Sequence, residues 1–151
     1  MNTKTRGLDE KDLRILEELM NNSRISYSDL AKKIGLSDVA IIKRIKKLEE
    51  AGIIKKYTIV IDPSKLGYKL VSLTGINVQP QELFNVIEEL KKIDNIKYIA
   101  LTSGDHHIMA IIWARSQEEL TSIHRRILEI EGVERVYPAI LLERIKGQVC
   151  L

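Results

Sequence analysis

The sequence predicts an α+β protein with an N-terminal helix-turn-helix domain, winged-helix-like, and a C-terminal ferredoxin-like βαββαβ domain. Two patterns predict this fold class. The first 51 residues contain three short helical patterns, each preceded by a capping residue. From residue 69 onward the patterns follow the order strand, helix, strand, strand, helix, strand. A chain of 151 residues is long enough for two small domains.

The first helix is expected to have Asp9 as its N-cap and Asp12 at the third helical position, which together form a capping box. Leu8 and Leu13 flank this start as a hydrophobic staple. The spacing of the apolar residues predicts that the inward face of this helix contains Leu13, Leu16, Leu19 and Met20.

Ser26 and Ser37 are the expected N-caps of the second and third helices. Only Gly35 and Leu36 separate the second helical pattern from Ser37, so the two helices should cross steeply, as in a helix-turn-helix. Gly52 is expected to end the third helix. Its inward stripe is predicted to be Ile41, Ile45 and Leu48.

Residues 55–68 are predicted to link the domains, which gives a DNA-binding domain over 1–54 and a second domain over 69–151. The β-branched run over 53–61 indicates an extended strand, and Asp62-Pro63 followed by Gly67 indicates a capped turn.

The second domain is predicted to have strands over 70–78, 96–102, 108–114 and 133–146. Pro80 opens its first helix, and Ser116 with Glu119 forms the capping box of its second helix. The third strand is apolar on both faces, so both faces should be buried. Pro138 in the last strand is expected at a sheet edge or a bulge.

Two helices on one face of a single sheet leave the other face uncovered. An apolar sheet face in a domain of this size would form a large exposed patch. A second copy is the simplest cover, so the sequence predicts a homodimer or a larger closed oligomer.

The composition is typical of a soluble globular protein, with 44% hydrophobic and 30% charged residues. No apolar run approaches the roughly 20 residues of a membrane helix, and residues 1–7 are polar and basic with no apolar signal region behind them. We therefore expect a cytoplasmic protein with no membrane partner.

The net charge of +3 is unevenly distributed. Residues 1–61 contain 13 Lys and Arg against 9 Asp and Glu, whereas residues 62–151 contain 11 against 12. An N-terminal positive excess is expected of a part that contacts DNA phosphates, and ordinary variation in surface charge is the alternative explanation.

Neither a catalytic nor a metal site is expected, and no cofactor. The single cysteine, Cys150, forms no internal disulfide, and no metal-binding Cys/His spacing is present. An enzyme is the second hypothesis, because Asp105, His106 and His107 are adjacent and His124 lies on a helix. However, neighbouring strand residues point to opposite faces, and no nucleophile with a base at a known spacing is present.

The sequence resembles the Lrp/AsnC family of prokaryotic regulators, also called feast/famine regulators, from Leu8 to Lys146. The ordered set of motifs is specific, although each motif alone is weak. The motifs are residues 8–12, residues 30–37, residues 44–54, Tyr57, residues 61–67 and Gly104-Asp105.

This resemblance implies a helix-turn-helix, winged or plain, followed by a ferredoxin-like ligand-binding module. It implies a DNA-binding transcription regulator whose partners are double-stranded DNA and a small effector, usually an amino acid. It further implies a homodimer that assembles further, often into an octamer, with effectors bound between neighbouring effector domains.

The DNA contacts are expected on the third helix, opposite its core stripe, because a recognition helix places its N-terminal residues on base edges. Val39 and Ile42 are apolar and off the core stripe, so they would pack on thymine methyl groups, or they form the margin of the core. The alternative for the lysines is a solvated helix face. The candidates are Ser37, Asp38, Val39, Ile42, Lys43, Lys46 and Lys47, with Ser28, Lys32 and Lys33 as weaker phosphate contacts on the second helix. Arg44 is expected to form a structural salt bridge instead.

The resemblance places effector binding at the turn after the second sheet strand, where Ser103, Gly104, Asp105 and His107 are the candidate lining. Family members commonly carry a second acid where this chain has His107, so one group that would hold an ammonium is missing. Ala139, Ile140 and Leu141 are candidates from a facing subunit. A plain hairpin turn at Gly104-Asp105 is the alternative, and a ligand-independent architectural DNA-binding protein of the same fold is the alternative function.

Overall fold

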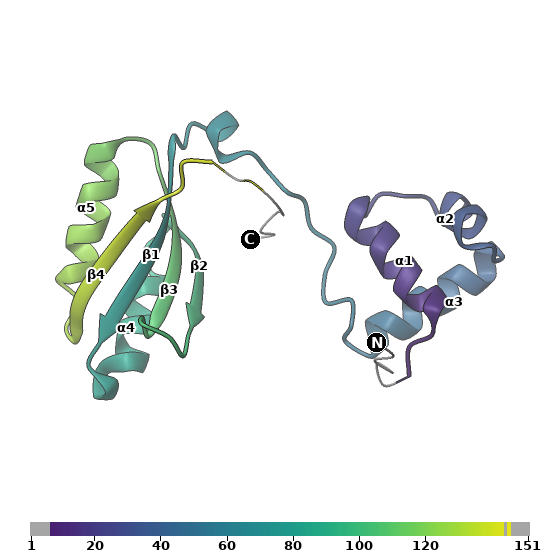
Figure 1. Cartoon of the computed structure of the whole chain (residues 1–151), viewed down its shortest axis with the longest axis horizontal. Helices are drawn as coiled ribbons and strands as arrows, with labels where there is room; N and C mark the ends of the chain where they lie inside the picture. The colour runs from purple at the N-terminus through teal and green to yellow at the C-terminus, as the bar shows by residue number, and fades with distance from the viewer. Residues whose placement is uncertain (1–6, 144, 146–151) are drawn as a thin grey trace. The chain divides into compact units, whose positions relative to one another are not determined.

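A computed structural model describes residues 7–143 and residue 145. The chain divides into two compact units, Met1–Ile59 and Val60–Leu151, which are described separately (Figure 1). Two predictions reach beyond the described residues: Cys150 lies outside them, and so do Arg144 and Lys146 of the expected last strand.

The first unit contains α1 (Glu10–Asn21), α2 (Tyr27–Ile34) and α3 (Asp38–Glu50). The predicted caps are confirmed: Asp9 and Asp12 form a reciprocal capping box, and the Ser26 and Ser37 hydroxyls accept from backbone N–H groups. Gly35, at φ 73°, ends α2 in the left-handed region and leaves the short turn into α3.

The core of this unit contains the predicted α3 stripe of Ile41, Ile45 and Leu48. Ile15 from α1 and Leu30 from α2 pack against that stripe, and both side chains are fully buried. The three helices therefore share one small core, which fixes α3 and presents its opposite face to solvent.

The predicted inward face of α1 is right for Leu16 and Leu19, which pack against the core, and wrong for Leu13 and Met20. Leu13 and Met20 are 46% and 86% exposed, whereas Asp12 is buried beside the fully buried Ile15. The sequence predicted Asp12 as a capping residue and gave no sign of its burial. Its burial is possible because a guanidinium from α3 pairs with it.

The predicted strand over 53–61 is absent: these residues form no strand, and the described part of the first unit has none after α3. A strand requires a neighbour for its backbone groups, and no other segment of the described chain pairs with this one. Ile53 and Ile54 form a bend, and residues 55–61 have no regular secondary structure.

The second unit has the predicted order of elements. It consists of a short 3-10 turn η1 (Pro63–Leu66), β1 (Leu70–Val78), a second 3-10 turn η2 (Pro80–Glu82), α4 (Leu83–Lys91), β2 (Ile96–Leu101), β3 (Ile108–Ala114), α5 (Gln117–Leu128) and β4 (Val133–Ile140). The four strands form one antiparallel sheet in the order β2-β3-β1-β4. This is the ferredoxin-like arrangement that the sequence predicts.

Helices α4 and α5 cover the same face of this sheet (Figure 1). Their buried residues, such as Leu90 and Ile127, pack on alternate residues of β1 and β3. β3 is buried on both faces, as predicted. Pro138 lies on the edge strand β4, where its missing N–H is tolerated, and β4 ends at Ile140 rather than continuing toward Lys146.

The other face of the sheet carries no helix. Val71 and Leu73 of β1, Ile111 of β3 and Tyr137 of β4 share this uncovered face, because Leu73 pairs with Ile111 and Gly75 pairs with Tyr137. Leu73 and Tyr137 are each 39% exposed. We call this apolar surface the open sheet face.

A buried polar chain lies beneath α5. The His124 Nε2 atom is 3.0 Å from Thr74 Oγ1, which is 2.9 Å from Ser72 Oγ. All three residues are buried. Burial lowers the pKa of His124 below its usual value of 6.5, because the site disfavours the charged imidazolium.

This burial predicts acid sensitivity of the second unit. Because the folded-state pKa of His124 is below the unfolded-state value, the unfolded chain binds the proton more readily, and stability falls as pH drops below about 6.5. Urea unfolding followed by Trp113 fluorescence at several pH values between 5 and 8 measures this loss. A His124→Gln variant should lose this part of the pH dependence, and an unchanged slope in that variant would contradict the assignment.

Candidate nucleic-acid interface and ligand loop

The face of α3 opposite its core stripe is fully accessible. The predicted DNA contacts are all exposed: Ser37, Asp38, Val39, Ile42, Lys43, Lys46 and Lys47 on the α3 side, and Ser28, Lys32 and Lys33 on α2. Val39 is 75% exposed and Ile42 is 46% exposed, so neither belongs to the core.

The lysines on this face differ in their partners. Lys46 lies 3.8 Å from Glu50, and Lys32 lies 3.9 Å from Asp29, both in exposed pairs. Lys43 and Lys47 have no ion-pair partner among the described residues. Exposed ion pairs of this kind contribute only about 0–1 kcal/mol, so the lysines of this face remain available to an anionic partner.

Lys33 contacts two residues of α1. Its ammonium is 2.5 Å from Glu18, and its backbone carbonyl accepts a hydrogen bond of 3.0 Å from Arg14. The expectation of a phosphate contact therefore fits Ser28 and Lys32 better than Lys33.

Arg44 forms the expected structural salt bridge. Its guanidinium donates to Asp12 at 2.6 Å and contacts Asp9 at 2.8 Å, which joins α3 to the start of α1. The two carboxylates raise the pKa of Arg44, Asp12 more than Asp9. A hydrogen bond from the Asp12 backbone, followed by the Arg44 contact, lowers the pKa of Asp9. Arg44 thus fixes the orientation of α3.

The loop from Thr102 to His107 joins β2 to β3. The Thr102 backbone donates to the His107 carbonyl at 3.0 Å, which closes the loop at its base. Ser103, Gly104 and Asp105 are exposed at its tip. A Cβ at Gly104 would meet no atom within 4 Å, so a ligand has free access to this backbone.

His107 is held by the backbone of β1. Its Nδ1 atom accepts a hydrogen bond of 3.1 Å from the N–H of Val78, a buried residue at the irregular end of the β1–β4 pairing. An Nδ1 atom that accepts carries no proton, so the neutral ring carries its proton on Nε2. The remaining nitrogen of His107 is therefore a donor.

His106 points elsewhere, as the alternation of side chains along a strand predicts. A Cβ at Gly75 would overlap its ring, its centroid is 4.7 Å from that of Tyr137, and its Nδ1 is 3.3 Å from Asn77 Oδ1. Sequence reasoning missed this cluster. The signal was Gly75, because a glycine inside a strand marks a close approach.

Within one chain, Ala139, Ile140 and Leu141 lie away from the loop. Ile140 pairs with Ser72 and the Leu141 N–H donates to Val71, whereas the loop enters β3 opposite Ile76. Three to five strand residues separate these positions, about 10–17 Å along the strand. One chain does not bring the two predicted groups together, in keeping with their prediction as residues of facing subunits.

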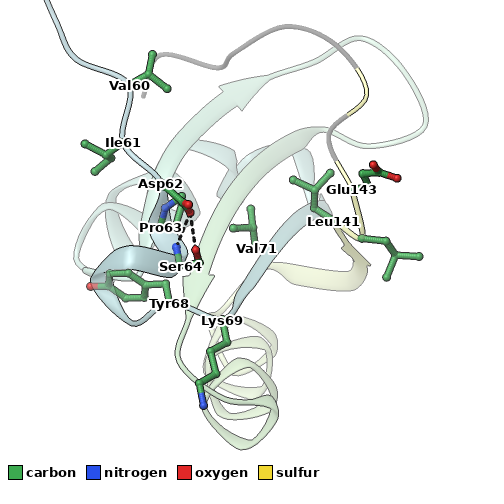
Figure 2. A pocket seen from close by; sticks show the side chains of 11 residues that line it. Val60, Ile61, Asp62, Pro63, Ser64, Tyr68, Lys69, Val71, Leu141 and Glu143 are labelled. Carbon is green, nitrogen blue, oxygen red and sulfur yellow. Dashed lines mark hydrogen bonds between the residues drawn. The ribbon is translucent and has the colours of Figure 1, made fainter.

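A cavity of ≈ 610 Å³ lies between the start of the second unit and the end of β4. Figure 2 shows the Asp62 carboxylate turned toward Ser64, whose backbone N–H and hydroxyl donate to it at 2.9 and 2.7 Å. Among the predicted effector residues, only Leu141 lines this cavity. The cavity is thus separate from the loop over residues 102–107.

No group of three or more His, Cys, Asp and Glu side chains is placed to hold a metal ion in residues 7–143 and 145. In the same residues, no helix has the length and apolar character needed to cross a membrane.

Two family descriptions match the chain in sequence order. Residues 8–55 match the family described as winged helix-turn-helix DNA-binding, and residues 72–149 match the Lrp/AsnC ligand binding domain. The first match covers α1 to α3, and the second covers most of the ferredoxin-like unit.

Related proteins extend over nearly the whole chain. It is 49% identical over 140 residues to the HTH-type transcriptional regulator LrpA of Pyrococcus horikoshii, covering 92% of this chain and 99% of that protein. The LrpA of Pyrococcus abyssi is 48% identical with the same coverage. These relatives are named as regulators, which confirms the prediction that the chain is not an enzyme.

Solved structures show the same fold. Escherichia coli AsnC superposes with a TM-score of 0.84 at 28% identity, over 94% of this chain and 97% of that one. Bacillus subtilis LrpC superposes with a TM-score of 0.83 at 28% identity, over 92% and 97%. With both domains matched in order, the chain belongs to the Lrp/AsnC family of helix-turn-helix transcriptional regulators.

Proposed function

We propose that this regulator binds specific DNA operators through α3, as a homodimer or larger closed assembly such as an octamer, and that a small effector, an amino acid, changes its assembly or DNA affinity. The observation that carries this proposal is the solvent face of α3, where Val39 and Ile42 are exposed beside Lys43, Lys46 and Lys47.

The chemistry of this face suits the major groove. Apolar side chains at the start of α3 would contact thymine methyl groups, and Lys43 or Lys46 would reach guanine. The remaining lysines would contact phosphates, which adds affinity that salt screens. Arg44 contributes indirectly because it holds α3 against α1.

A charge-deletion pair tests the DNA interface. Replacing Lys43 and Lys46 by Ala should weaken operator binding and make the plot of log affinity against log salt shallower by about 2, because one of the two lysines contacts a phosphate in each subunit of the dimer and each phosphate contact contributes about 1 to that slope. Fluorescence anisotropy at roughly 50 to 300 mM salt gives both the operator affinity and its salt dependence.

The matched control removes two lysines of α4, Lys91 and Lys92, which pair with Glu88 and Glu89 in the second unit. This control has the same net charge as the α3 pair and should keep the wild-type slope. Equal slopes for both double variants would refute the proposed interface.

The proposal of a dimer rests on the open sheet face. Leu73, Tyr98 and Tyr137 are each at least 39% exposed on strands whose other face is packed. An apolar surface that spans a whole sheet is favourably covered by a second copy. A two-fold dimer presents two α3 helices to two half-sites.

For the effector we propose the loop over residues 102–107, where an effector carboxylate would accept hydrogen bonds from the His107 Nε2–H and from the backbone N–H of Gly104. Gln and Glu have side chains of equal length, and each would retain an oxygen that accepts from the Val78 N–H. Comparing His107→Gln with His107→Glu therefore tests effector binding while the contact with Val78 is kept. We expect His107→Gln to retain effector affinity and His107→Glu to lose it at least about tenfold, since the outward group changes from donor to anion.

The measurement is thermal unfolding against a panel of the twenty amino acids, because a ligand that binds only the folded chain raises the melting temperature. Equal shifts in the Gln and Glu variants would contradict the role of His107. No shift with any amino acid, in a protein that still binds its operator, would favour the ligand-independent architectural function.

A further inference from the structure

The segment that follows α3 is held against that helix at three points. Gly52, at φ 68°, reverses the chain, and the N–H groups of Ile53 and Ile54 both donate to the Leu48 carbonyl, at 2.9 and 3.1 Å. Ile54 packs against the core of the first unit. The third point is the Tyr57 hydroxyl, which donates to Glu49 Oε1 at 2.8 Å.

The Tyr57 phenol keeps the proton that it donates to Glu49. Partial burial, then the neighbouring Glu49 carboxylate and Tyr27, raise the pKa of Tyr57 to about 12. The phenol therefore stays protonated and continues to donate to Glu49 throughout the physiological pH range.

Beyond Tyr57 the chain loses this support. Residues 58–61 form no regular secondary structure, Ile59 is 72% exposed, and the first compact unit ends at that residue. The part of the linker that is not held against α3 therefore begins after Tyr57. Without the Tyr57–Glu49 hydrogen bond, this unheld part would begin after Ile54.

We propose that the Tyr57–Glu49 hydrogen bond is a positioning contact that sets the half-site spacing accepted by the dimer. Loss of this hydrogen bond releases residues 55–57 from α3, which adds about 10 Å of extended chain to the linker. Because one base-pair step spans about 3.4 Å, this added reach corresponds to about three base pairs. This inference rests on the proposed binding of a dimer to paired half-sites.

The test is an affinity profile of the full chain on DNA duplexes that carry two selected half-sites, at the preferred spacing and at spacings changed by one to three base pairs. A duplex with a single half-site is included. Wild-type protein should discriminate between spacings. Tyr57→Phe and Glu49→Ala should reduce the preference for the best spacing about fivefold, the typical worth of one such hydrogen bond, and should keep single half-site affinity within about twofold.

Two controls distinguish positioning from a general structural defect. Glu49→Gln retains an oxygen that accepts from Tyr57, so it should retain the wild-type profile. Tyr68→Phe removes a phenol hydroxyl in the second unit that has no hydrogen-bond partner among the described residues, and it should also change nothing.

Unchanged spacing profiles in Tyr57→Phe and Glu49→Ala would overturn the inference, and so would a change in only one of them. A wild-type protein that binds one half-site specifically but accepts every spacing equally would overturn it while leaving α3 as the DNA-reading helix. A wild-type protein that fails to prefer the half-site over random DNA would overturn both proposals.

Discussion

Replacing Arg44 by Met should lower the free energy of unfolding of the first unit by about 2–3 kcal/mol. The substitution leaves the Asp12 carboxylate, which is only 5% exposed, without its cationic partner. Breaking a buried pair by removing one member typically costs about 3–5 kcal/mol, and we expect less here because the Arg44 side chain is 29% exposed. The loss should also weaken DNA binding, since Arg44 orients α3.

Two probes separate the units in this experiment. The helical circular dichroism signal contains α1 to α3 together with α4 and α5, whereas Trp113, the single tryptophan, lies on β3 and reports on the second unit alone. Arg44→Met should move only the part of the circular dichroism transition in urea that Trp113 fluorescence does not follow, and it should leave the Trp113 transition in place. The double variant Asp12→Asn with Arg44→Met should be more stable than Arg44→Met alone, because no buried unpaired charge remains: Asp9, the other partner of Arg44, is 54% exposed. If the single variant matches wild type, the Arg44–Asp12 pair does not hold the unit together.

Gly132→Ala should cost the second unit about 3 kcal/mol or more. Gly132 has φ 90°, and a Cβ there would overlap the side-chain carbons of Glu82 and approach Val86 to 3.5 Å. The Gly132 carbonyl also accepts from the Gln79 N–H at 2.8 Å, so the backbone cannot move freely. Conformational strain of about 1 kcal/mol and a steric clash therefore act together.

Gly67→Ala is the matched control. Gly67 has φ 87°, nearly the same conformation, but a Cβ there would meet nothing within 4 Å. It should lose only about 1 kcal/mol, the part due to the positive φ. The Trp113 transition in urea measures both variants, and equal losses would show that the contact with Glu82 is relieved without cost.

Local patterns predicted most of the fold. Capping by Asp9, Ser26 and Ser37, the apolar stripe of α3, and the bounds of β1 and β3 all follow from neighbours a few residues apart in sequence. Such signals act through the local backbone, so they do not depend on the rest of the chain. The domain boundaries remain a proposal, consistent with compact units that meet between Ile59 and Val60.

The predictions that were wrong depended on distant partners. The inward position of Asp12 depends on Arg44, which lies 32 residues away. The expected strand over 53–61 has the right residues for a strand but no pairing neighbour in the described chain. A single sequence gives no direct information on either relation.

The candidate site was predictable in its location and less so in its detail. The exposed face of α3 follows from its periodicity, so its residues could be named. The hydrogen bond between His107 and Val78 could not be predicted, because it forms at an irregularity in strand pairing. Tyr57 was noted only as part of a family motif, because its bond to Glu49 requires the reversal at Gly52.

Whether α3 reads DNA sequence can be measured by selection from a random duplex library with the purified protein. We expect recovery of a discrete motif in two half-sites about one helical turn apart, or a multiple of it. Substituting Val39 and Ile42 by Ser should change the preferred bases while leaving the salt dependence largely intact. A library that returns no motif, with DNA bound at comparable affinity whatever its sequence, would contradict sequence reading by α3 and leave an architectural DNA-binding protein.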